Sequence, residues 1–108
     1  MHSRLTLHEA LVEALGSRHV YFQPPEEVEM KYPAIRYQLQ GSRVKRANGG
    51  LYLNDQSYAV TIIDEDSDSE IPARVQNLPF CKFDRFYVAD NLNHWVYVIY
   101  VNKDYKEK

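Results

Sequence analysis

Residues 94–101, HWVYVIYV, decide how this chain folds, because seven of the eight are apolar. Successive side chains of a strand point to opposite faces of the sheet. One face therefore carries Trp95, Tyr97, Ile99 and Val101, and the other carries Val96, Val98 and Tyr100. An antiparallel strand with one wet face normally alternates apolar with polar residues. We expect this strand either to be central and covered on both faces, or to be covered by another subunit.

The segment before it, FCKFDRFYVAD at 80–90, is predicted to be its hairpin partner, with NLN at 91–93 as the turn. The part KFDRFYV has spaced aromatics, as RNA-recognition sheets do, but it lacks both glycines of their motif. Since the chain is also slightly acidic, we interpret this segment as a core strand.

A second period of two begins at Ala34 and places Ile35, Tyr37 and Leu39 on one face. Its partner is SYAVTIID at 57–64, and ANGG at 47–50 is a strong turn signal between them. The long connection predicts a long hairpin whose tip projects from the body. A shorter strand is expected in HVYFQPP at 19–25, ended by the two prolines.

Helical spacing occurs twice. Leu7, Leu11 and Leu15 predict a helix over 6–15, with Thr6 and Glu9 as a capping box and Gly16 as its left-handed end. A second, short helix is predicted from Ile71 to about Pro79. The sequence therefore predicts an α+β fold: one mostly antiparallel sheet, two helices and one projecting hairpin.

The acidic stretch DEDSDSE at 64–70 precedes this second helix. A calcium loop of the EF-hand type needs glycine at its sixth position and glutamate at its twelfth, but Ser69 and Val75 stand there. Acidic residues and serine favour a helix N-terminus, and Pro72 suits the first turn. We interpret the stretch as a helix entrance with a solvated acidic face, which is compatible with an acidic contact surface.

Length and composition fit one domain over 1–108, with a polar tail at 103–108 that we expect to fray. A net charge of −2 gives nucleic-acid binding little support. Cys81 is the only cysteine, and no apolar run approaches the length of a membrane span. Cys81 and His94 could be a nucleophile and base, but neither lies in a recognisable catalytic motif. The histidines do not have the spacing of a metal site either. We therefore expect no enzyme, metal site or cofactor.

Three segments together carry a family resemblance. They are VYFQPPEEVEMKYPAIRYQL at 20–39, SYAVTIIDEDSDSEIP at 57–72, and LPFCKFDRFYVADNLNHWVYVIY at 78–100. In this order and in a chain of this length, they resemble the tail-completion proteins of long-tailed bacteriophages, which include tail terminators and tail-to-head joining proteins. The resemblance covers about residues 5–102.

That resemblance implies a structural virion protein, assembled in the bacterial host cytoplasm, that forms a ring, typically a hexamer. The ring sits on the head-proximal end of the tail tube. Its partners are then further copies of itself, the tail tube protein and the head connector, with DNA only passing through. We expect the subunit and partner interface to include Arg43, Lys45, Arg46, Leu51, Tyr52, Trp95, Tyr97 and Tyr100. The alternatives are a head-side connector or stopper, and a nucleic-acid or ligand-binding α+β module.

Overall fold

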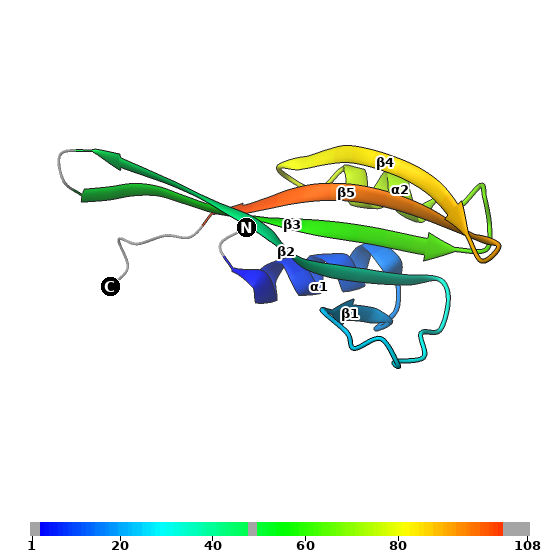
Figure 1. Cartoon of the computed structure of the whole chain (residues 1–108). Helices are drawn as coiled ribbons and strands as arrows, with labels where there is room; N and C mark the ends of the chain where they lie inside the picture. The colour runs from blue at the N-terminus through cyan, green and yellow to red at the C-terminus, as the bar shows by residue number, and fades with distance from the viewer. Residues whose placement is uncertain (1–2, 48–49, 103–108) are drawn as a thin grey trace.

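The structure is a computed structural model that describes residues 3–47 and 50–102, with side chains described outside 44–54. It contains one five-stranded sheet and two helices (Figure 1). The elements are α1 (Arg4–Leu15), β1 (Val20–Phe22), β2 (Ala34–Ala47), β3 (Gly50–Asp64), α2 (Ile71–Gln76), β4 (Cys81–Ala89) and β5 (Leu92–Asn102). The strand order is β1-β2-β3-β5-β4, with β1 parallel to β2 and every other pair antiparallel. The predicted α+β fold is confirmed.

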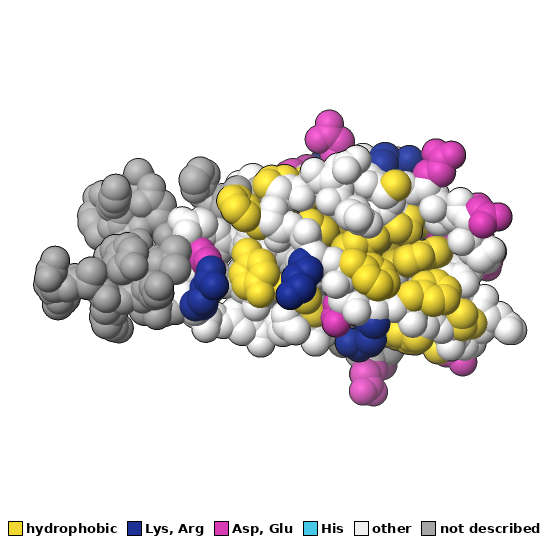
Figure 2. Space-filling view, turned by 90° about the horizontal axis from the view of Figure 1, so that it is seen from above, with side chains coloured by type: hydrophobic (Ala, Val, Ile, Leu, Met, Phe, Trp, Pro, Cys, Tyr) yellow, Lys and Arg dark blue, Asp and Glu magenta, His cyan; other side chains and the backbone are white. Residues whose placement is uncertain are grey.

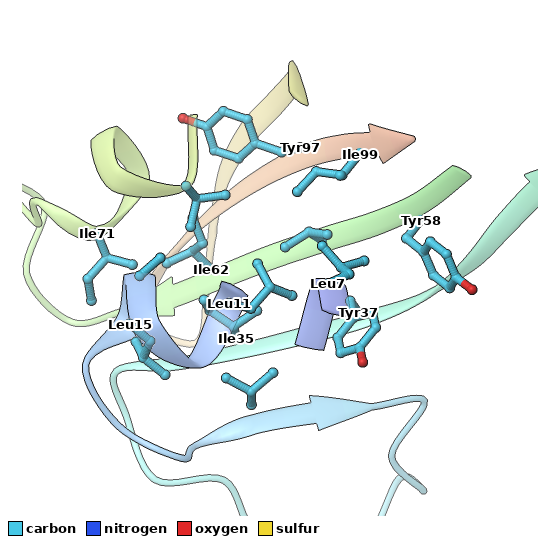
Figure 3. Close-up of a cluster of buried hydrophobic side chains, with 14 of the residues drawn as sticks. Leu7, Leu11, Leu15, Ile35, Tyr37, Tyr58, Ile62, Ile71, Tyr97 and Ile99 are labelled. Atoms are coloured by element: carbon cyan, nitrogen blue, oxygen red, sulfur yellow. The ribbon is translucent and has the colours of Figure 1, made fainter. Parts of the chain in front are cut away.

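Both helices pack on one face of the sheet and share one hydrophobic core (Figure 3). Leu7 and Leu11 of α1 are completely buried, as are Ile35 of β2, Ile62 of β3 and Ile99 of β5. Burying a side chain of this size typically contributes about 1.5–3 kcal/mol relative to leaving it exposed. The leucine spacing along α1 and the alternation along the strands therefore meet in the same layer. No helix in the part of the chain that the structure describes is long and apolar enough to cross a membrane.

The N-terminus of α1 differs from the predicted capping box. The helix begins at Arg4, and its N-cap is Ser3, whose extended backbone lets Oγ accept a hydrogen bond from the Thr6 amide at 3.1 Å. Thr6 lies inside the helix, so the predicted start at this residue was wrong. Gly16 ends the helix with φ 87°, and its amide donates to the Val12 carbonyl, as its position predicted.

The hairpin of β4 and β5 confirms that β5 is central, because it pairs with β3 on one side and with β4 on the other. Its turn is formed by Asp90 and Asn91, which have φ 55° and 62°, rather than by the predicted 91–93. Two consecutive residues with positive φ fit the two-residue turn of a tight hairpin. The interpretation of KFDRFYV as a core strand was wrong, because β4 lies at the edge of the sheet.

Strands β2 and β3 form the long hairpin, and they run past the rest of the sheet in Figure 1. The neighbour β1 pairs only with 35–37 of β2, and β5 ends opposite Asp55 of β3. The part of the hairpin beyond Arg43 and Asp55 is therefore a two-stranded ribbon, which we call the arm. Of the predicted ANGG turn, residues 48–49 lie outside the described residues.

The acidic stretch is the entrance to α2, as predicted. Asp64 and Asp66 each accept a hydrogen bond from the amide two residues further on, at 3.1 and 2.9 Å, and Ser69 Oγ accepts from the Ile71 amide at 3.2 Å. The serine does the capping, because the N-cap residue itself makes no side-chain hydrogen bond. Pro72 lies in the first turn.

Candidate contact surfaces

The predicted interface residues fall into three groups. Arg43 lies at the base of the arm and is exposed, whereas the side chains of Lys45, Arg46, Leu51 and Tyr52, further along the arm, lie outside the described residues. Trp95 and Tyr100 are half-buried on β5. Tyr97 is only 2% exposed, and its hydroxyl donates to Gln76 Oε1 at 3.1 Å. Tyr97 therefore belongs to the core of the chain and is not accessible to a partner.

The sequence did not single out the apolar surface along β4. Phe80, Phe83, Phe86 and Val88 are between 47% and 69% exposed. Figure 2 looks down from the side on which β4 lies in Figure 1, and hydrophobic side chains gather in the middle of that face, with charged side chains around them. Singly exposed apolar residues are ordinary, but a group of large ones on one edge is typical of a contact surface.

Two of these rings are held in place from below. Phe83 meets Tyr97 edge-on, with ring centroids 5.4 Å apart, and the Phe86 ring lies 5.5 Å from that of Trp95. Aromatic pairs at such separations are mutually stabilising. The core therefore fixes the orientation of each ring, while about half of the side chain remains exposed. A partner can bind this exposed part with little further loss of side-chain entropy.

The edge of β4 is interrupted by a bulge at Asp84, where the register with β5 shifts between Phe83 and Arg85. Asp84 also accepts a hydrogen bond from Arg85 at 3.0 Å. Bulges and charged side chains are the usual devices that keep an edge strand from pairing with other strands. The side chains of β4, rather than its backbone, therefore form the better contact surface.

A cavity of about 450 Å³ lies where the arm leaves the body. On one side, the carboxylate of the buried Asp55 accepts hydrogen bonds from Arg43 at 2.5 Å and from Asn102 at 2.7 Å. The Arg43 guanidinium also lies over the Tyr100 ring, 5.8 Å from its centroid. The remaining lining residues are Phe80, Cys81 and Lys82. Burial raises the pKa of the Cys81 thiol to about 11, so the thiol is uncharged at neutral pH.

A smaller depression of about 220 Å³ lies on the face of the sheet that points away from the helices, and it includes Arg36, Thr61 and Arg85. Beside it, the ring of His94 stacks on that of Tyr87, with centroids 4.5 Å apart. His94 pairs with Tyr87 and Cys81 pairs with Ile99, five residues further along β5, which separates them by about 17 Å. Cys81 and His94 therefore do not form a nucleophile and base pair.

Among the described side chains, no group of three or more histidine, cysteine, aspartate or glutamate residues is placed to hold a metal ion. What the described residues bring together is a set of contact features: an aromatic edge, a polar depression and a cavity with cationic groups. Comparison with models of known protein families finds no match, and comparison with curated proteins finds none either.

Proposed function

We propose that this chain is a structural component of a phage neck, which forms a ring at the head-proximal end of the tail and there terminates the tail tube, joins the tail to the head, or does both. In this role the protein acts by docking to copies of itself, to the tail tube and to the head connector. It is then located in the virion after assembly in the host cytoplasm.

The observation that carries the proposal is the exposed aromatic edge of β4. Phe83 and Phe86 are each about half exposed, yet each ring is oriented by a partner in the core. Preorganised aromatic side chains are the residue type that contributes most to protein interfaces. The sequence resemblance described above supplies the biological setting, and the arm adds a second extended element with which a neighbour or the tube can be reached.

The test is electron microscopy of lysates from the parent phage with this gene disrupted. Tails of abnormal length support termination of the tube, and finished tails beside DNA-filled heads support joining. A matched pair of complementing variants sharpens the result. Phe83→Ser on the exposed edge is expected to fail to complement, while Leu39→Ser, at an apolar residue of β2 that is equally exposed, is expected to complement. Normal infectious particles from the disrupted phage would refute the proposal.

The alternative roles give different results in the same material. A head-side connector or stopper leaves tail length normal and the heads unable to retain DNA. A nucleic-acid-binding module predicts RNA or DNA binding by the purified chain that weakens steeply with salt. Binding of that kind, together with normal particles, would replace the neck assignment.

A further inference from the structure

Two surfaces of opposite charge lie near the two ends of the part of β3 that pairs with β5. The cavity at the base of the arm contains Arg43 and Lys82 beside the start of the body, at Asp55. The acidic stretch 64–70 follows the other end of the strand. Nine residues separate Asp55 from Asp64, which at about 3.3 Å per residue is about 30 Å. The two features therefore cannot meet within one chain.

The cavity has unused capacity for a carboxylate. Asp55 is engaged by Arg43 and Asn102, but a guanidinium has five N–H donors, and the contact with Asp55 uses few of them. Lys82 adds a second cation to the lining, and its side chain is exposed. With Asp55 counted, the lining carries one net positive charge. Tyr100 and the exposed Phe80 supply apolar walls for the aliphatic part of an incoming side chain.

The acidic stretch is a preorganised ligand of the complementary kind. Its backbone is fixed by hydrogen bonds that the amides of Asp66 and Asp68 donate to the carboxylates of Asp64 and Asp66, and Asn93 Nδ2 donates to the carbonyls of Asp64 and Glu65. Glu65 and Asp68 are exposed, and among the described residues neither forms an ion pair. These two carboxylates can therefore bind a partner without breaking the local structure.

We propose that copies of this chain associate head to tail, with the acidic stretch of one copy, through Glu65 and Asp68, docking at the Arg43–Lys82 cavity of the next. Because the two surfaces differ, the contact is heterologous, and a series of such contacts closes into a ring if the rotation permits. This inference gives the residue contacts of the self-assembly in the proposed function and rests on that self-assembly. It does not depend on the assembly being part of a phage.

The first test uses two introduced cysteines in a Cys81→Ser background, because the native thiol packs against the core. Phe80 lines the cavity and is 69% exposed, so Phe80→Cys places an accessible thiol there. In Phe80→Cys combined with Asp68→Cys, mild oxidation at concentrations where the wild type associates is expected to give disulfide-linked multimers of more than two copies. The matched control combines Phe80→Cys with Glu27→Cys, which places the second cysteine at another exposed acidic position. Equal cross-linking of the two variants would overturn the proposal, as would equal cross-linking by Asp68→Cys without Phe80→Cys.

The second test distinguishes head-to-tail association from any symmetric contact. Lys82→Glu reverses a charge in the cavity and leaves the acidic stretch intact, whereas Glu65→Lys with Asp68→Lys reverses the charges of the acidic stretch and leaves the cavity intact. Each preparation alone is expected to associate at least tenfold more weakly than the wild type in sedimentation velocity. An equimolar mixture is expected to recover, because intact stretch meets intact cavity and reversed stretch meets reversed cavity. The recovery should decline with added salt. A mixture no better than its components would refute the proposal.

A wild-type chain that stays monomeric up to about 1 mM also overturns this inference. The neck assignment is separable from these results, because it is decided by the particles that the disrupted phage makes. Abnormal tails without this contact would leave the neck function standing with a different interface. Normal particles with this contact confirmed would leave a head-to-tail assembly of another function.

Discussion

Replacing Tyr37 by phenylalanine is the sharpest test of how the core holds α1 to the sheet. Tyr37 is 1% exposed, and its hydroxyl is hydrogen-bonded to Arg4 Nη1 at 3.1 Å and to His8 Nδ1 at 2.7 Å. A typical hydrogen bond contributes about 0.5–1.5 kcal/mol net. Arg4 and His8 are only half-buried, so water can replace the lost hydroxyl in part. We therefore expect Tyr37→Phe to lower the free energy of unfolding by about 1–2 kcal/mol.

Urea unfolding followed by circular dichroism measures this change, and the midpoint of thermal unfolding should fall by about 4–10 °C. The ring itself remains, with its contacts to Phe22 and Tyr58 at centroid distances of 5.0 and 5.9 Å. The matched control is Tyr21→Phe on the neighbouring strand, where the side chain is half-exposed and a change below about 0.5 kcal/mol is expected. Equal effects of the two substitutions would refute the argument that the Tyr37 hydroxyl anchors α1.

The same residue gives a pH signature. Burial raises the pKa of Tyr37 above its ordinary value of 10.0. The unfolded chain then loses this proton more readily than the folded one, so the stabilisation is fully present below pH 10 and is lost as the pH rises beyond it. The pKa values of Tyr58 and Tyr97 are also raised by burial. Tyr37→Phe should therefore lose less stability above pH 10 than the wild type does, and an identical alkaline decline would contradict this account.

Three further outcomes are expected. Ser3→Ala should lower the free energy of unfolding by about 1 kcal/mol because it removes the N-cap of α1, whereas Thr6→Ala should lower it by less than about 0.5 kcal/mol. The reverse order in urea unfolding would instead favour the capping box of Thr6 and Glu9. Gly16→Ala should cost about 1 kcal/mol although no atom crowds the new Cβ, because φ is 87°; an unchanged melting temperature would contradict this. Since burial raises the Cys81 pKa from 9.0 to about 11, iodoacetamide should alkylate it about 100-fold more slowly at pH 8.5 than in urea-unfolded chain; equal rates would refute its burial.

The elements that the sequence predicted well are those set by local periodicity. The leucine spacing of α1 and the alternation of β2, β3 and β5 arise because one face of each element is buried. Such a pattern can be recognised within about a dozen consecutive residues, without knowledge of the rest of the fold. The central place of β5 was also predicted, because its apolar residues are typical of a strand with a neighbour on each side; both helices, however, cover only one of its faces. The start of α1 was missed because Ser3 and Thr6 are both good caps, and the choice depends on backbone geometry at Ser3.

The position of β4 was missed for a different reason. Phe83 and Phe86 are as apolar as the residues of a core strand, and the neighbouring charges of Lys82, Asp84 and Arg85, which are typical of an edge strand, were not used. The decisive fact is the strand order, which places β5 between β3 and β4 and leaves β4 with one neighbour. The cavity was likewise hidden, since it joins residues of β2, β3, β4 and β5 that are up to 59 positions apart, from Arg43 to Asn102.

The aromatic edge and the cavity are different kinds of surface, and this difference bears on how a ring closes. The bulge at Asp84 and the charges of Lys82 and Arg85 disfavour strand addition along β4, so two copies gain little by joining their sheets edge to edge. A contact made of opposite charges sets orientation and the rate of encounter, whereas buried aromatic area supplies most of the affinity. We therefore expect head-to-tail pairing through Glu65 and Asp68 to orient the copies, while Phe83 and Phe86 remain available to hold a partner of another kind.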